Sequence, residues 1–206
     1  FKLLGRQIDI HTGGIDHIPV HHNNEIAQSE GATGKQYVRY WVHNAFLNID
    51  NNKFSKSAGN GIMLHNLVDT GYPAQSYRYW LLTGHYRSPM NFTFEALQAS
   101  RQALFRLKRH IIEEYKDTKG SVNEPYMHQF LTAISDDLDT PKAIALIWDM
   151  VKDASISNGD TYATLKEMDK ILGIGLSDDI ETSARSIGIY TEESLPSDIQ
   201  ALVDKR

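Results

Sequence analysis

The stretch Ile8-Asp9-Ile10-His11-Thr12-Gly13-Gly14-Ile15-Asp16 predicts a short β-strand that ends in a glycine turn. Gly13 and Gly14 have no side chains, so a ligand can approach their backbone closely at the carboxyl end of the strand. Asp16 lies just beyond the turn, where its carboxylate can accept hydrogen bonds from both hydroxyls of a ribose. Taken alone, such a turn is more often structural than functional. The sequence downstream decides between the two interpretations.

The segment that follows predicts a helix and then a second strand. Pro19 suits the entrance of a helix over roughly 20–31, which Gly31 and Gly34 would stop. Residues 37–49 are dense in aromatic and β-branched side chains, which is typical of a buried strand.

A loop rich in lysine and serine comes next: Lys53-Phe54-Ser55-Lys56-Ser57, continued by Ala58-Gly59-Asn60-Gly61. Its asparagine and glycine neighbours favour turns and mobility. A lysine ammonium is a compact point charge on a flexible stem, suited to neutralising a phosphate that gains charge during a reaction. A solvated Lys/Ser loop is common, but after the upstream Gly-Gly-Asp turn the pair of motifs favours an adenosine site.

Helices dominate the remainder of the chain. Apolar spacing and turn residues predict two short helices within 64–84, a long helix over 93–116, and further helices over 126–135, from Thr140-Pro141 onward with Thr140 as N-cap, and over 161–172. The character changes to helices alone past residue 118, so we expect a domain boundary near 115–122. The chain begins at Phe1 and stops as a helical pattern begins, which we interpret as an internal piece of a longer protein.

Composition narrows the class of protein. The 206 residues are 41% hydrophobic, enough for one large domain or two small ones. No apolar run is long enough to span a bilayer, so we expect a cytoplasmic protein without a membrane partner. The absence of cysteine excludes disulfides and thiolate metal sites built from this chain alone. A net charge of −5 argues against a small generic DNA- or RNA-binding module.

In their order and spacing, these blocks resemble the class I aminoacyl-tRNA synthetases, and most closely the cysteinyl-tRNA synthetase family. The family's Lys-Met-Ser-Lys-Ser loop is matched by Lys53–Ser57, with Phe54 in place of the methionine. The family's Asp-Ile-His-Gly-Gly-Gly strand end is matched by Asp9–Gly14, with Thr12 in place of the first glycine.

The resemblance continues through Pro19–Glu25, which is similar to the family segment Phe-Pro-His-His-Glu-Asn-Glu, with Asn23 in place of the first glutamate. Further similarity lies in residues 40–44, 84–88 and 136–141, so the resemblance runs from about residue 7 to 175. It implies an α/β fold, the back half of a Rossmann-like catalytic domain followed by an α-helical bundle. The expected domains are 1–117, with the lysine loop and connecting helices, and 118–206, a bundle on the tRNA side.

His21 and Glu25 are four residues apart, which places them on one face of a helix, where an imidazole and a carboxylate can chelate Zn²⁺. An isolated His/Glu pair of this kind is usually only a pair of surface side chains. The resemblance implies that this His and Glu join two cysteines, expected in a missing N-terminal part, to hold a zinc ion that grips the thiolate of the substrate cysteine. His22 is expected to pack or to face solvent, and His11 is either a wall of the active site or a core or surface histidine.

The resemblance also implies roles in ATP binding. Lys56 matches the second lysine of the family loop, which stabilises the triphosphate while the amino-acid carboxylate attacks the α-phosphate, and Lys53 assists. The implied ATP-binding residues are Gly13, Gly14, Asp16, Ser55, Lys56 and Ser57, with Mg²⁺ accompanying the nucleotide.

The function implied is that of a cysteine–tRNA ligase, with cysteine, ATP and tRNA(Cys) as its substrates and partners. By itself the chain is expected to be inactive. Two alternatives stay open: a ligase that joins cysteine to a glucosaminyl-inositol in mycothiol biosynthesis, and a non-catalytic RNA- or metal-binding module derived from a synthetase.

Overall fold

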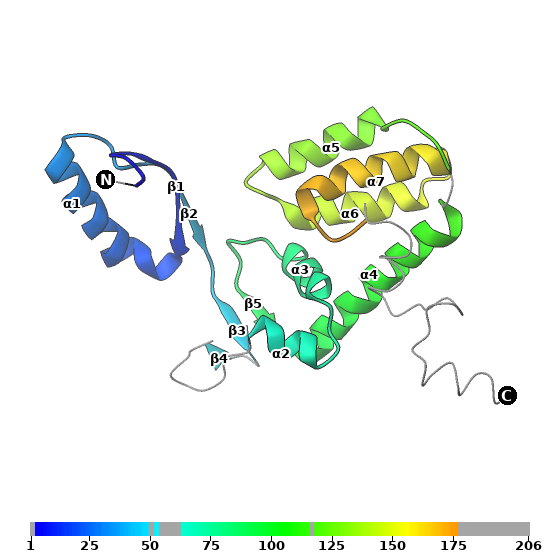
Figure 1. Cartoon of the computed structure of the whole chain (residues 1–206), viewed down its shortest axis with the longest axis horizontal. Helices are drawn as coiled ribbons and strands as arrows, with labels where there is room; N and C mark the ends of the chain where they lie inside the picture. Colours follow the sequence, from blue (N-terminus) through cyan, green and yellow to red (C-terminus); the bar gives the residue numbers. More distant parts are fainter. Residues whose placement is uncertain (1–2, 50–51, 54–62, 116–117, 177–206) are drawn as a thin grey trace. The chain divides into compact units, whose positions relative to one another are not determined.

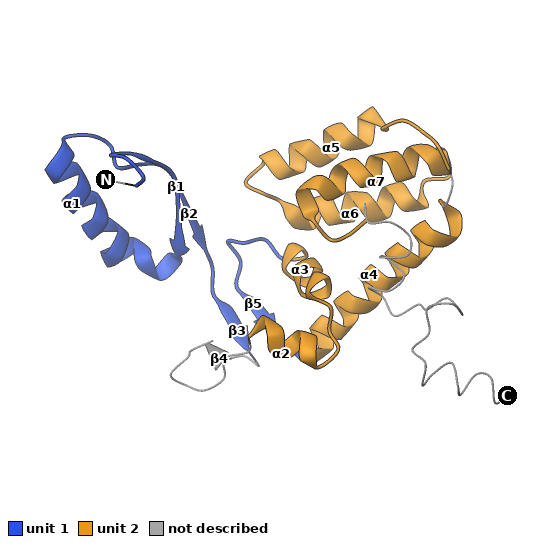
Figure 2. Cartoon of the chain, in the orientation of Figure 1, with its two compact units in different colours: residues 1–61, 84–93 blue, residues 62–83, 94–206 orange. Residues whose placement is uncertain are grey.

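The computed structural model describes residues 3–49, 52–53, 63–115 and 118–176 (Figure 1). Contacts divide the chain into two compact units (Figure 2), with unit 1 formed by residues 1–61 and 84–93 and unit 2 by residues 62–83 and 94–206.

Unit 1 contains a parallel pair of strands, β1 (Ile8–Gly14) and β2 (Val38–Asn44). Parallel strands need a crossover connection, and here the chain crosses over through three consecutive helical segments. These are a 3₁₀ turn (Ile15–His17), a π-helical turn (Ile18–His22) and α1 (Asn23–Thr33). The strand, helix and second strand expected from the sequence are therefore confirmed.

Two details of the crossover and the second strand differ from the expectation. The helix expected from residue 20 runs as a π-helical turn through His22. The helix α1 then continues past Gly31, where a stop was expected, to Thr33, and Gly34 caps it with a φ of 64°, in the left-handed region that favours glycine. The second strand is buried only in part. Tyr40 is 69% exposed and its register partner Ile10 is 61% exposed, because no described segment covers these two neighbouring side chains.

A second sheet in unit 1 has three short strands in the order β4–β3–β5. Strand β3 (Leu47–Ile49) pairs antiparallel with β4 (Asn52–Lys53) and parallel with β5 (Met90–Phe92). The backbone of Lys53 therefore ends a strand at the start of the lysine loop.

The described part of unit 2 consists of helices and their connections, as the sequence predicts. They are α2 (Leu64–Asp69), α3 (Ala74–Leu82), α4 (Phe94–Glu114), α5 (Glu124–Ser135), α6 (Thr140–Lys152) and α7 (Asn158–Leu172). The two short helices expected within 64–84 are confirmed as α2 and α3, and the long helix expected over 93–116 is confirmed as α4.

The core of unit 2 lies where α3 to α7 face one another. Leu107 of α4, Phe130 of α5, Ile147 of α6 and Leu165 of α7 are fully buried in one apolar cluster. Burial of such side chains removes apolar surface from water, which is the main favourable term in folding.

Polar contacts fix α3 onto the other helices of unit 2. The indole nitrogen of Trp148 on α6 donates a 2.9 Å hydrogen bond to the Tyr79 hydroxyl on α3. The Arg78 guanidinium, also on α3, donates to the carbonyl of Leu172, the last residue of α7. The end of α7 carries partial negative charge, so a cation there is favourable.

Side-chain caps set where the last helices begin. Asn123 accepts a hydrogen bond at the start of α5, Asp139 at the start of α6 and Ser157 at the start of α7. The expected N-cap Thr140 is wrong by one position: Thr140 is the first residue of α6, and the Asp139 carboxylate accepts from the Lys142 amide. Aspartate is a strong N-cap, so the acidic run before this helix has a structural role.

The grouping of contacts differs from a domain boundary near residue 117. Helices α2 to α4 group with the later helices because α3 and α4 contribute Tyr79, Leu104, Leu107 and Ile111 to the shared core. Among the described residues the last strand is β5, so the part that contains helices alone begins with α4 and not at residue 118.

We expect Leu107→Ala to lower the free energy of unfolding of unit 2 by about 2 to 5 kcal/mol, because it removes a fully buried side chain and leaves a cavity. Leu131→Ala on α5 is the matched control: this leucine is 42% exposed, so the loss should stay near the small surface effects of about 0.5 kcal/mol. Urea denaturation followed by circular dichroism measures both. Equal losses in the two variants would contradict the described core.

Candidate metal and substrate site

The carboxylate of Glu25 lies between two imidazoles in unit 1. Its Oε2 lies 2.7 Å from Nε2 of His11, which comes from β1, and its Oε1 lies 3.3 Å from Nε2 of His21, one helical turn before it. The expected pairing of His21 with Glu25 is therefore seen, and His11 joins it from a different element. All three side chains are partly accessible, with His21 the most exposed.

His22 lies beside this group and is the most deeply buried histidine of the cluster, at 4% exposure. Its Nδ1 is 2.8 Å from Nε2 of His43 on β2, and its ring packs against those of His11 and Trp41, at centroid distances of 4.9 Å and 4.7 Å. His22 therefore packs, as expected, but it also reaches the candidate metal group. One ligand atom each from His11, His22 and Glu25 lie within 4.8 Å of one another.

The surroundings of Gly13 and Gly14 leave no room for a side chain. A β-carbon there would collide with the rings of His22 and His17. At Gly14, a β-carbon would collide with the carboxylate of Asp16, which folds back over the turn. The two glycines thus let imidazoles and a carboxylate approach the end of β1, and their role in nucleotide binding stays a prediction.

The protonation states of Glu25 and His22 suit binding of a cation. Burial would raise the pKa of Glu25, but the hydrogen bond from His11 and the charges of His11 and His21 outweigh it, so the pKa lies below its usual value. Burial, with the charges of His11 and His43, lowers the pKa of His22. At neutral pH the carboxylate is therefore ionised and the His22 imidazole is neutral.

The donor set fits zinc. Imidazole nitrogen and carboxylate oxygen are two of its three usual ligand types, and the third is thiolate sulfur, which this chain lacks. A histidine that binds metal usually forms a hydrogen bond through its other ring nitrogen, as the contact between His22 and His43 would allow. His11 and His22 therefore join His21 and Glu25 as candidate ligands.

The sequence held a usable signal for these additional residues. In the parallel pairing of β1 and β2, His11 is the register partner of Trp41 and Gly13 that of His43. Alternate residues of a strand share a face, so this register brings the rings of His11, Trp41 and His43 together. The signal requires knowing that the two strands pair, which neither strand reveals alone.

The lysine loop lies mostly outside the described residues. The structure gives only the backbone of Lys53, at the end of β4, while Ser55, Lys56 and Ser57 fall in a range that is not described. Their assignments stay predictions.

Within the described ranges, no helix has the length and apolarity needed to cross a membrane.

A family model described as the catalytic domain of class I (C) tRNA synthetases matches residues 1–102. A solved structure with a similar fold is the LeuRS of a ternary LeuRS–tRNA–LeuAMS complex from Agrobacterium radiobacter K84. The likeness has a TM-score of 0.64 at 17% identity and covers 89% of this chain and 28% of that one. At this identity the likeness shows the fold alone.

Curated relatives extend the match to the whole chain. A protein named Cysteine--tRNA ligase from Treponema denticola is 39% identical over 230 aligned positions, covering 100% of this chain and 46% of the relative. Cysteine--tRNA ligase 1 from Burkholderia lata is 43% identical over 176 positions, covering 85% and 37%. A Cysteine--tRNA ligase from Chlamydia muridarum is 37% identical, covering 99% and 46%.

The chain thus spans a little under half the length of these relatives. The same residues that form the strand, crossover and histidine cluster fall within the match to the synthetase catalytic domain. By its fold and by these matches, the chain belongs to the cysteinyl-tRNA synthetase family of class I aminoacyl-tRNA synthetases.

Proposed function

We propose that the chain is part of a cysteine–tRNA ligase that works in the cytoplasm. The cysteine carboxylate attacks the α-phosphorus of ATP and pyrophosphate leaves. The cysteinyl group then passes from the adenylate to a hydroxyl at the 3′ end of tRNA(Cys), and AMP leaves. The observation that carries the proposal is the carboxylate of Glu25, held by His11 and His21 beside the neutral, buried His22. This cluster supports recognition of a thiol through a metal ion.

His21 and Glu25 are the proposed zinc ligands, completed by ligands from outside this chain. A bound zinc ion would favour the thiolate of cysteine over the hydroxyl of serine, because soft thiolates bind zinc far better. His11 orients Glu25 by holding one of its oxygens, which leaves the other directed to His21. His43 holds the ring of His22 through a contact of 2.8 Å between His43 Nε2 and His22 Nδ1.

ATP is proposed to bind with Mg²⁺ between the β1 turn and the lysine loop. Gly13, Gly14 and Asp16 would contact the adenosine, and the loop residues Ser55, Lys56 and Ser57 the phosphates, with Lys53 assisting. Charge develops on the leaving pyrophosphate, so a cation that meets it only in the transition state raises the rate without tightening ground-state binding.

A chimera tests this function directly: the chain replaces the matching segment of the Treponema denticola relative. We expect the purified chimera to attach radiolabelled cysteine to tRNA(Cys) and to leave serine unattached. Cysteine ligation to a glucosaminyl-inositol acceptor without tRNA charging would favour the mycothiol alternative. A folded chimera inactive in both assays would contradict the proposal.

The metal site can be tested in the chain itself with Co²⁺, a spectroscopic substitute for zinc. We expect weak binding that is lost on dialysis, because a tight zinc site normally has four ligands and this chain has no cysteine. Glu25→Gln should weaken binding by about tenfold or more, since even the loss of an outer partner costs this much. His65→Ala, an exposed histidine on α2, is the matched control.

The same titration separates the two candidate sets of ligands. Loss of binding in His21→Ala with retention in His22→Ala supports His21 and Glu25 as the ligand pair. Loss of Co²⁺ binding in His22→Ala alone would instead identify His11, His22 and Glu25 as the ligands, without His21. Binding that survives Glu25→Gln would contradict both sets.

In the chimera, Glu25→Gln should raise the KM for cysteine by about tenfold or more and leave the KM for ATP nearly unchanged, because the metal contacts the thiol and not the nucleotide. Cysteine-dependent ATP–pyrophosphate exchange gives both constants. Equal increases in the two constants would indicate a purely structural metal.

Lys56→Ala in the chimera should slow adenylate formation by about a hundredfold or more, the scale of removing one preorganised charge stabiliser. ATP binding should change much less, and Lys56→Arg should restore only part of the rate, because a planar fork does not replace a compact point charge. Rapid-quench measurement of pyrophosphate release follows this step. Unchanged adenylation with weakened tRNA binding would move the loop from catalysis to RNA recognition.

A further inference from the structure

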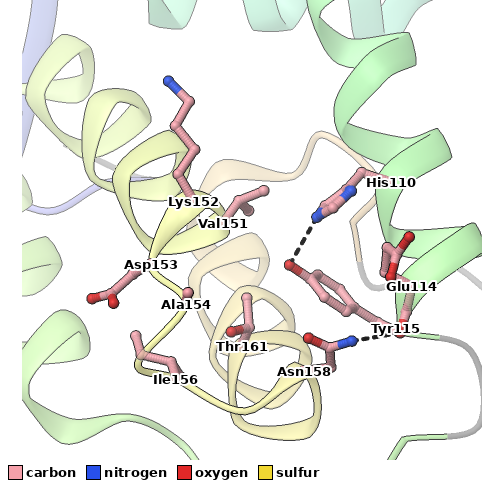
Figure 3. Close-up of a pocket in the computed structure, with 10 residues that line it drawn as sticks. All are labelled: His110, Glu114, Tyr115, Val151, Lys152, Asp153, Ala154, Ile156, Asn158 and Thr161. Carbon is pink, nitrogen blue, oxygen red and sulfur yellow. Dashed lines mark hydrogen bonds between the residues drawn. The ribbon is translucent and has the colours of Figure 1, made fainter.

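Unit 2 contains a pocket that the proposed chemistry does not use (Figure 3). It lies between the C-terminal end of α4 and the turn that joins α6 to α7, and its volume is about 320 Å³. We call it the α4–α7 pocket. Its walls include His110, Tyr115, Val151, Ile156, Asn158 and Thr161.

Thr161 is the strongest sign that the pocket takes a polar guest. The residue is 2% exposed, and its hydroxyl has no hydrogen-bond partner in the described part of the chain. A buried hydroxyl without a partner costs free energy, and such groups are rare in folded proteins. A ligand that supplies the missing partner would recover this cost.

Two further polar groups face the same space. The Tyr115 hydroxyl lies 3.1 Å from Nε2 of His110, and burial, with the charge of Glu114, raises the Tyr115 pKa, so the hydroxyl stays neutral. The Asn158 side-chain nitrogen donates a 3.0 Å hydrogen bond to the Glu114 carbonyl. The amide oxygen of Asn158 remains as an acceptor. The pocket thus offers hydroxyl, imidazole and amide groups.

Charge disfavours an anionic guest. Asp153 is occupied by hydrogen bonds from Tyr126 and Ser155, and Figure 3 shows its carboxylate and the Lys152 ammonium pointing away from the other side chains. The carboxylate of Glu114 remains beside the ring of Tyr115 (Figure 3). A phosphate placed here would meet this negative charge without a facing cation from Lys152.

The shape and lining fit a guest with one apolar face and several hydroxyls. Val151 and Ile156 supply apolar walls from the α6–α7 side, opposite the rings of His110 and Tyr115 (Figure 3). The volume lies at the lower end of small-molecule sites, which span about 300 to 1,000 Å³. We propose that the α4–α7 pocket binds an uncharged nucleoside, its base between the apolar and aromatic walls and its ribose hydroxyls on Thr161 and Asn158. The nucleoside is either a free molecule or one unstacked residue of an RNA, and the two sources are distinguished below.

This proposal goes beyond the proposed function and does not depend on it, since the test needs no aminoacylation. Saturation-transfer NMR on the 206-residue chain, with adenosine, guanosine, cytidine and uridine as probes, measures binding. Thr161→Val keeps the shape of the side chain and removes its hydroxyl. It should therefore weaken binding of the preferred nucleoside by about fivefold to tenfold, the effect of one lost hydrogen bond. Its melting temperature should stay equal or rise, because the buried hydroxyl has no protein partner to lose.

Thr132→Val on α5 is the matched control, because the Thr132 hydroxyl is satisfied by the carbonyl of His128 at an exposed position. It should leave nucleoside binding unchanged. The corresponding nucleoside 5′-monophosphate should bind less tightly than the nucleoside, because of Glu114. Tighter binding of the monophosphate that persists in Thr161→Val would overturn the proposal.

A short single-stranded RNA, titrated in parallel, distinguishes the two sources of the nucleoside. RNA binding that weakens in Thr161→Val and resists competition by free nucleosides supports an unstacked RNA residue as the guest. Nucleoside binding that is sensitive to Thr161, with RNA binding unaffected, supports the free molecule. If neither probe shows binding that depends on Thr161, the pocket is not a nucleoside site.

Discussion

The contacts of the Glu25 carboxylate with two imidazoles tie together β1 and its crossover in unit 1. His11 reaches the carboxylate from β1, and His21 reaches it from the turn before α1, so one carboxylate joins the strand to its crossover. The rings can lie this close to the strand because Gly13 has no β-carbon for them to strike. Burial around His22 keeps that imidazole neutral, while the imidazoles around Glu25 keep the carboxylate ionised. A single constraint thus sets both the local fold and the charge state of the candidate ligands.

The two units are stabilised by different physics. Unit 1 places its functional groups through polar contacts among histidines, a carboxylate and a tryptophan, and its sheet pair leaves Ile10 and Tyr40 exposed. Unit 2 depends on a continuous apolar core, to which α3 is fixed by Trp148 and by Arg78 at the end of α7. Polar networks fix direction and charge, whereas apolar burial supplies most of the folding free energy.

Features encoded locally could be predicted from the sequence, and features that depend on contacts between elements could not. Apolar spacing located α4, and Gly71 with Pro73 separated α2 from α3, because helix periodicity and turn residues act over a few positions. The pairing of His21 with Glu25 followed from helical geometry alone. His11 and His22 needed the packing of β1 against the crossover, and the grouping of α4 with α5–α7 needed a shared core. The choice of Asp139 over Thr140 as cap was decided by the position of one backbone amide.

If Glu25 and its imidazoles present a metal ion to the thiol of cysteine, as proposed, X-ray absorption at the zinc edge should detect the contact between zinc and sulfur. The zinc-loaded chimera with the Treponema denticola relative would be measured with and without cysteine. We expect one additional sulfur neighbour of zinc when cysteine binds, and loss of zinc in the Glu25→Gln form. A zinc environment that does not change on addition of cysteine, in a chimera that still charges tRNA, would contradict it.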